Sequence, residues 1–283
     1  MFSSRRLRSL LWRLDRLLER WERGFLPPTA SLLNKNNVFR WHASPWGGGE
    51  LLAVNTFQPL PLELLLGIDR AKAILLRNTQ SFAAGLPANN ALLWGSRGTG
   101  KSSLVKAVAA TCFPGLKLVE IHKDDIAFLP MIAHHLRPYP LPFLFFCDDL
   151  SFERHDGAYK AMKSVLEGGV AGRPDNVLLY ATSNRRHLMA REVVNEGEAY
   201  HPAESAEEQI SLSDRFGLWL GFHPFDQQTY LEIVEGYARS LALPVARARL
   251  HAEALEWANT RGARSGRVAH QFIIDLTGRL TSP

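Results

Sequence analysis

Cysteine is scarce in this chain of 283 residues, which contains only Cys112 and Cys147. The two lie far apart in the sequence, each among apolar residues, so neither a disulfide framework nor a cysteine-rich metal site is expected. Two unpaired cysteines are typical of a protein kept in a reducing compartment, and we therefore expect a cytoplasmic location.

Long hydrophobic runs are also lacking. A membrane-spanning helix needs about 20 consecutive apolar residues, whereas the longest such run here, from Leu141 to Cys147, has the length of a β-strand. We therefore expect no transmembrane segment. The N-terminus is rich in arginine, as transit peptides are, but Asp15, Glu19 and Glu22 argue against a cleaved targeting signal.

Two classes of enzyme have no support in the sequence. Neither a His-Glu-x-x-His motif nor a Gly-x-Ser-x-Gly nucleophile elbow occurs, so we expect neither a zinc peptidase nor a hydrolase built on that elbow. The histidines without a metal-ligand spacing include His122, His134, His135, His155 and His187.

The composition is that of a folded globular protein, with 46% hydrophobic and 22% charged residues. The length suits about two domains. A formal net charge of +5 permits a phosphate-bearing partner without requiring one.

Residues 1–60 are expected to form an N-terminal helical appendage. Residues 3–25 place apolar side chains at three- and four-residue spacings, which predicts an amphipathic helix that ends before Pro27. Residues 34–49 are expected to be irregular, because Gly47-Gly48-Gly49 breaks any periodicity. The apolar stripe could pack on the protein's own core or a sister subunit, lie on a membrane surface, or contact a partner protein or nucleic acid.

Residues 61–224 alternate between strand-like and helical segments. Continuous apolar runs suit a sheet that is covered on both faces, so we expect an α/β domain with a five-stranded parallel sheet in three layers. The expected strands are 91–94, 116–121, 143–147, 177–182 and 218–222, and the expected helices are 68–84, 101–110, 124–136 and 159–166.

Residues 225–283 have helical patterns only, over 226–241, 247–260 and 265–280. We expect a small C-terminal helical lid. The acidic stretch 192–208 is interpreted as a solvated insertion in the preceding domain.

The strongest motif has the P-loop pattern G-x-x-x-x-G-K-[ST]. It lies between an expected apolar strand and an expected helix, which is the context that a P-loop requires. Its glycines let backbone N–H groups point at a phosphate, and the following helix adds its N-terminal partial charge. Lys101 would reach the β- and γ-phosphates of ATP, and Ser102 would offer its hydroxyl to Mg²⁺. The expected nucleotide-binding residues here are Gly95, Ser96, Arg97, Gly98, Thr99, Gly100, Lys101, Ser102 and Ser103.

A second motif is the apolar strand 143–147, which ends in two carboxylates. Asp148 occupies the position of a Walker B acid on the Mg²⁺ side. Its neighbour Asp149 would orient or activate the attacking water, because catalysis of phosphoryl transfer is mostly positioning and charge stabilisation. The alternative is a pair of aspartates that caps the next helix.

Three further polar residues complete the candidate site. Asn184, at the tip of the strand 177–182, could bind the γ-phosphate or the attacking water, or could be a turn residue. Arg215 could reach a neighbouring subunit's nucleotide as an arginine finger, or could form a surface ion pair with Asp214. Arg267 follows the expected N-cap Ser265, where the helix dipole disfavours a cation, so an anionic partner is the better explanation.

These motifs, in this order and followed by a helical lid, resemble those of the AAA+ ATPases over residues 60–283. More narrowly, Leu93-Trp94-Gly95 and the segments 147–153, 180–188 and 211–220 are similar to a bacterial family of AAA+ proteins of unknown function. The resemblance implies Lys101 and Ser102 as Walker A, Asp148 and Asp149 as Walker B, Asn184 as sensor 1, Arg215 as the arginine finger and Arg267 as sensor 2.

The resemblance further implies a homo-oligomeric ATPase that uses ATP and Mg²⁺ to remodel or assemble a macromolecular partner, either protein or DNA. AAA+ proteins usually carry Asp-Glu in Walker B, whereas this chain has Asp148-Asp149. The shorter second acid favours the alternative of a slow or non-hydrolysing ATP switch that recruits its partner.

Overall fold

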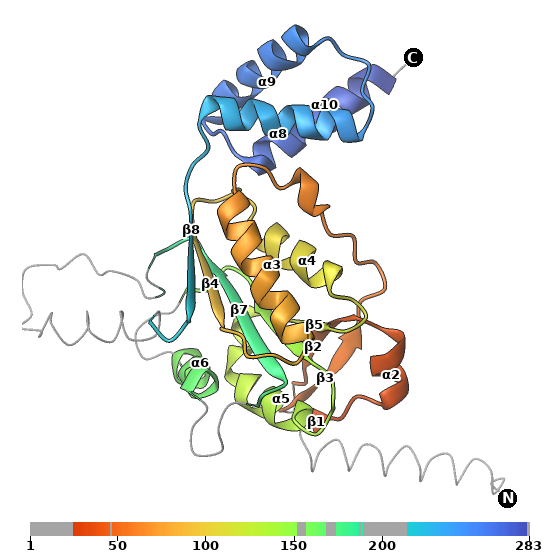
Figure 1. Ribbon diagram of the computed structural model, residues 1–283, viewed down its shortest axis with the longest axis vertical. Coiled ribbons are helices and arrows are strands. Elements are labelled where there is room, and N and C mark those ends of the chain that lie inside the picture. Colours follow the sequence, from red (N-terminus) through yellow and green to blue (C-terminus); the bar gives the residue numbers. More distant parts are fainter. Residues whose placement is uncertain are drawn as a thin grey trace, which may run out of the picture.

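The computed structural model describes residues 25–45, 47–151, 157–167, 174–186, 188 and 214–281. Within these residues the chain forms an eight-stranded sheet in the order β1-β3-β2-β5-β6-β7-β4-β8, with helices on both faces (Figure 1). The predicted helix over 3–25, apart from Phe25, and the acidic stretch 192–208 lie outside the described residues.

Five adjacent strands of the sheet are parallel, and they are the five that the sequence predicts. They are β5 (Lys117–Ile121), β6 (Phe143–Cys147), β7 (Val177–Ser183), β4 (Ala91–Gly95) and β8 (Leu218–Phe222). Every residue of β6 and β7 is buried, as expected for strands covered on both faces. The expected three-layer α/β fold is confirmed.

The sheet is larger than predicted, because the N-terminal segment adds three strands to it. They are β1 (Phe25–Leu26), β2 (Val38–Ala43) and β3 (Gly49–Ala53). Strand β2 runs parallel to β5 and antiparallel to β3. The expectation that residues 34–49 are irregular is therefore wrong. A short helix, α2 (Ala30–Lys35), precedes β2.

The three glycines that were interpreted as breaking periodicity lie in the β2–β3 hairpin. Gly47 and Gly48 have φ angles of 92° and 68°, which glycine adopts without the steric cost that other residues incur. Phe39 and Trp41 are buried, whereas the intervening Arg40 is exposed. This alternation is the strand signal, and the glycine run masked it.

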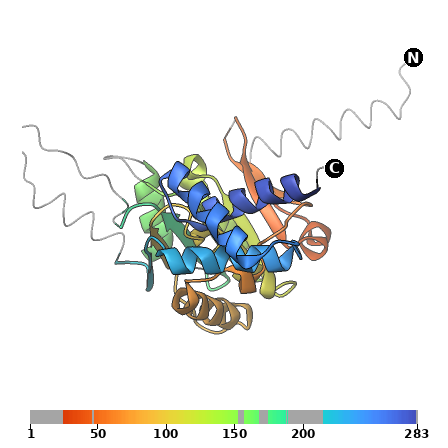
Figure 2. The same ribbon diagram turned by 90° about the horizontal axis from the view of Figure 1, so that it is seen from above.

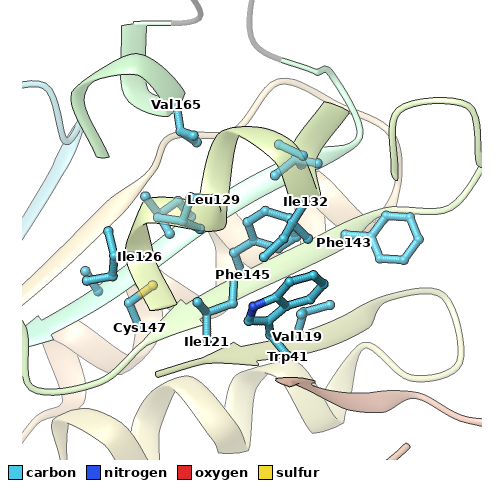
Figure 3. Packing of buried hydrophobic residues seen from close by; sticks show 14 of the residues in the cluster. Trp41, Val119, Ile121, Ile126, Leu129, Ile132, Phe143, Phe145, Cys147 and Val165 are labelled. Atoms are coloured by element: carbon cyan, nitrogen blue, oxygen red, sulfur yellow. The ribbon is translucent and has the colours of Figure 1, made fainter. Parts of the chain in front are cut away.

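Helices form the two outer layers. One face of the sheet carries α3 (Asp69–Ala83) and α4 (Lys101–Thr111), and the other carries η2 (Lys123–Phe128), α5 (Leu129–Leu136) and α6 (Gly157–Glu167). Figure 3 shows the second face, where Ile126, Leu129 and Ile132 pack toward Phe145 of β6 and Trp41 of β2. This packing buries the N-terminal hairpin in the same core as the central strands.

The C-terminal segment forms the three expected helices. They are α8 (Gln227–Ser240), α9 (Arg247–Arg261) and α10 (Gly266–Thr281), and they share a separate hydrophobic core. This helical lid stands beyond the carboxyl ends of the parallel strands (Figure 1), and Figure 2 shows it from above. The short helix η1 (Leu62–Leu64) packs against both α4 and α8.

The division of the chain at residues 60 and 224 into appendage, nucleotide-binding domain and lid stays a prediction. No helix among the described residues is long and apolar enough to cross a membrane.

Candidate nucleotide-binding site

A cavity of about 920 Å³ lies between the carboxyl ends of the parallel strands and the lid. Most residues that the sequence predicts for the site line this cavity. They are Arg97, Gly98, Thr99, Gly100, Lys101, Ser102, Ser103, Asp148, Asp149, Asn184 and Arg267. Segments that are far apart in the sequence therefore meet in one place.

The loop between β4 and α4 has the backbone that its glycines permit. Gly98 and Gly100 have φ angles of 73° and 92°, in the left-handed region that side chains disfavour. The helix α4 begins directly after Gly100, so its N-terminal N–H groups and partial positive charge face the cavity. This is the arrangement that binds phosphate groups.

Lys101 is buried at the base of the cavity, with 7% of its surface exposed. Its Nζ donates to the carbonyl oxygens of Gly95 at 2.9 Å and Ser96 at 2.7 Å, and to Asn184 Oδ1 at 3.2 Å. Gly95 and Ser96, which do not line the cavity themselves, thus contact the site by accepting hydrogen bonds from Lys101 at their carbonyl groups. Burial lowers the pKa of Lys101; the nearby carboxylates Asp148 and Asp149 oppose this shift, and the Arg267 and Arg97 charges add to it.

Asp148 accepts two hydroxyl hydrogen bonds at the end of β6. Ser102 Oγ donates to Asp148 Oδ1 at 2.6 Å, and Thr182 Oγ1 donates to the same oxygen. A carboxylate and a hydroxyl side by side are oxygen ligands of the kind that Mg²⁺ prefers. The donor set therefore fits a magnesium ion that arrives with a nucleotide, with Ser102 and Asp148 as its protein contacts.

Asp149 is joined to the end of β7 by both its backbone and its side chain. Its N–H donates to Thr182 Oγ1 at 2.9 Å, and the Asn184 amide donates to its carboxylate. Asp149 has a φ angle of 54°, and aspartate and asparagine are the side chains most often found in this left-handed region. An aspartate at position 149 is therefore compatible with the backbone conformation found here.

The lid touches the loop directly through the start of α10. Ser265 Oγ accepts the Val268 N–H at 3.3 Å, which confirms Ser265 as the N-cap, and the Arg267 N–H donates to the Gly98 carbonyl at 3.3 Å. A Cβ added to Gly98 would lie 2.8 Å from Ser265 Oγ. Lid and loop are thus packed so closely that a side chain at position 98 would force Ser265 or the loop to shift.

Arg215 does not line the cavity. It lies before β8, and its Nε donates to the carboxylate of Glu167 at the end of α6. Among the residues that the structure describes, Arg215 thus pairs with Glu167 instead of forming the ion pair with Asp214 that the sequence offers as the alternative. Action of Arg215 on a neighbouring subunit's nucleotide stays a prediction.

Several residues that line the cavity carry no sequence motif. The apolar ones come from the segment before α3, from the β8–α8 connection and from α8, and the polar ones come from separate elements. They are Pro59, Leu60, Leu64, Leu65, Ile68, Phe225, Ile233 and Tyr237, together with Gln58, Lys106, Thr182 and His270. The polar end of the cavity lies at the loop, and the apolar end lies between η1 and the lid.

The charged side chains of the cavity are mainly cationic. Four cationic side chains, Arg97, Lys101, Lys106 and Arg267, line the cavity together with the two carboxylates Asp148 and Asp149. Among the described residues, no cluster of three or more histidine, cysteine or acidic side chains is placed to hold a metal by itself. The cavity suits a polyanion that carries its own cation.

Comparison with known proteins gives a family and a set of similar structures. The family described as "Protein of unknown function (DUF815)" matches residues 34–280. No curated protein matches this chain. Similar solved structures include the RuvB Holliday junction branch migration motor of Thermotoga maritima, which is 14% identical with a TM-score of 0.46, over 77% of this chain and 72% of that chain.

Two variants of the same Thermotoga maritima protein are also similar. One is 14% identical with a TM-score of 0.49, over 77% of this chain and 72% of that chain. The other is 15% identical with a TM-score of 0.48, over 78% and 74%. The assignment of the fold depends on the strand order and loop geometry described above.

Proposed function

This chain belongs to the DUF815 family. From the geometry of the site, we propose that it binds ATP with Mg²⁺ and hydrolyses the ATP. The observation that carries the proposal is a single connected set of polar groups. Lys101 bonds to Asn184, and Asn184 bonds to Asp149. The Thr182 hydroxyl joins Asp149 to Asp148, and Asp148 accepts from Ser102.

Each part of the cavity has a role in this proposal. Loop N–H groups, Lys101 and Arg267 bind the triphosphate, whose negative charge the cationic surplus complements. Mg²⁺, held by Ser102 and Asp148, would neutralise charge on the β- and γ-phosphates. The apolar end between η1 and the lid receives the base.

Asp149 and Asn184 are the groups that we assign to the attacking water. Both lie beside Lys101, and their side chains bond to each other. A carboxylate acceptor next to an amide can hold a water oriented for attack on the γ-phosphorus, with ADP as the leaving group.

We further propose that hydrolysis remodels or assembles a macromolecular partner, either protein or DNA, within a homo-oligomer. Support comes from the position of Arg215 outside its own cavity; to act in another subunit's site it would exchange its ion pair with Glu167 for the nucleotide. A slow ATP switch that recruits its partner is the second candidate. The feature that favours it is the second acid, Asp149, whose side chain is one methylene shorter than glutamate and already accepts the Asn184 amide at one carboxylate oxygen.

The test is phosphate release from MgATP, measured alone, with duplex DNA, and with proteins captured by the Asp149→Asn variant. The proposal expects release by the wild-type protein that Asp149→Asn abolishes. Release near the level of Asp149→Asn under all three conditions, with nucleotide still bound, would instead establish the switch.

A further inference from the structure

A cation–π contact joins the loop after β7 to the residue that precedes the P-loop. The guanidinium of Arg186 lies over the Trp94 ring, 5.2 Å from its centroid. Trp94 is directly followed by Gly95, and Arg186 is two residues beyond Asn184. The contact therefore links two segments that both bond to Lys101, one through the carbonyl groups of Gly95 and Ser96 and the other through the Asn184 side chain.

The Trp94 ring is held firmly enough to act as a platform. It packs against β8, where a Cβ on Gly221 would lie 2.9 Å from the ring. His223 contacts it edge-on at 6.0 Å, and Trp219 lies 6.4 Å away. The Ser96 N–H donates to the Phe222 carbonyl at 2.9 Å, so the chain on the other side of Gly95 is fixed to β8 as well.

The turn that carries Asn184 is fixed at its start by Ser183. Ser183 Oγ donates to the Leu150 carbonyl at 2.7 Å and accepts the Arg185 N–H at 3.1 Å. Beyond Arg185 the turn leaves the sheet, and at its far end Arg186 stacks on Trp94 and Leu188 is buried in the core. Asn184 stands between these two anchors, where its amide spans Lys101 and Asp149.

We propose that Arg186 is a positioning residue: by stacking on Trp94, it holds Asn184 in the orientation that serves the attacking water. This inference rests on the proposed function. Arg186 does not line the cavity, so its loss leaves the nucleotide contacts in place. A cation–π contact at an exposed site predicts an effect of about two- to fivefold on kcat.

The chain offers a matched control in Arg185, which is exposed on the same turn. Arg186→Ala is expected to lower kcat by about two- to fivefold with the KM for MgATP unchanged. Arg186→Lys, which keeps the cation, is expected to restore most of the rate, and Arg185→Ala to match the wild type. In a Trp94→Leu background, Arg186→Ala is expected to have no further effect, because the platform is already gone.

A second readout does not depend on turnover. The side-chain amide resonance of Asn184, identified by its loss in Asn184→Asp, is expected to shift in Arg186→Ala and to stay in place in Arg185→Ala. A wild type that hydrolyses ATP, with Arg186→Ala no slower than Arg185→Ala, would overturn the positioning role and leave the proposed function standing. A wild type without hydrolysis would overturn the proposed ATPase, and an unmoved Asn184 resonance in Arg186→Ala would then overturn the positioning role separately.

Discussion

Lys101 Nζ lies 3.2 Å from Asn184 Oδ1, so the P-loop lysine and the polar residue at the end of β7 are in direct contact. Asn184 in turn donates to Asp149. Lysine, amide and carboxylate therefore form a chain across the base of the cavity, and a γ-phosphate bound by Lys101 would displace or share part of it. This chain connects nucleotide binding to the group that we assign to the water.

The two aspartates are expected to differ in kind when each is replaced. Asp148→Ala removes the carboxylate beside Ser102 and should weaken binding of MgATP while leaving binding of metal-free ATP less affected. Asp149→Asn keeps a side chain suited to the φ angle of 54° and should bind MgATP but not hydrolyse it. Calorimetry with and without Mg²⁺, beside a phosphate-release assay, separates the two; equal loss of binding would mean that the roles are misassigned.

Gly98 tests the contact between the loop and the lid. Gly98→Ala places a Cβ 2.8 Å from Ser265 Oγ and costs about 1–2 kcal/mol for the left-handed backbone. Gly85 has a similar φ of 75° with open space around it, so Gly85→Ala carries the backbone cost alone. We expect both variants to melt earlier and only Gly98→Ala to bind nucleotide more weakly. If the two bind equally well, the lid contact does not matter for the site.

Arg215 distinguishes a shared active site from an isolated one. Arg215→Ala should keep its affinity for ATP, because the side chain lies outside its own cavity, and should lose turnover, by as much as on the order of 10³ if it acts as arginine fingers do. Mixing it with Lys101→Ala should restore activity, since one variant supplies the arginine and the other an intact pocket. No recovery, with a monomeric ATP-bound wild type in light scattering, would reduce Arg215 to the ion-pair partner of Glu167.

The lowered pKa of Lys101 predicts how binding depends on pH. Bound phosphates favour the charged lysine and raise its pKa, so binding takes up a proton when the pH lies between the free and bound values. Affinity for MgATP should therefore fall as the pH rises through the Lys101 pKa of the free protein, below the ordinary 10.5. Tyr237 also lines the cavity, and burial raises the pKa of its hydroxyl. Calorimetry in buffers of different ionisation enthalpy measures the proton uptake, and its absence in the alkaline range would contradict the assignment.

Much of the fold could be predicted because its signals are local. The strands β4, β6 and β7 are continuous apolar runs, and the P-loop motif fixes the position of α4. The hairpin of β2 and β3 was missed, since its alternation of buried and exposed residues is short and a run of three glycines follows it. Pairing of β2 with β5 depends on tertiary contacts that no short window reveals.

The candidate site also has one part that the sequence predicts and another part that it does not. Residues that contact phosphate or Mg²⁺ in our proposal lie in motifs, so the sequence predicts them. The apolar end of the cavity is assembled from η1, the connection to the lid and α8, and nothing in those segments distinguishes a cavity wall from an ordinary core. Thr182 bonds to Asp148 and Asp149. The sequence signal that could have identified it is a hydroxyl side chain at the end of an apolar strand, directly before Ser183.

A calorimetric titration with MgATP tests the central claim most directly. We predict that the wild-type protein binds one nucleotide per chain, and that Lys101→Ala weakens binding by about tenfold or more, because a charge-assisted hydrogen bond contributes about 1.5–3 kcal/mol. The control Lys160→Ala removes an exposed lysine of α6 outside the cavity and should bind as the wild type does. Absence of binding by the wild type, or equal affinity in all three proteins, would contradict the assignment of this cavity as an ATP site.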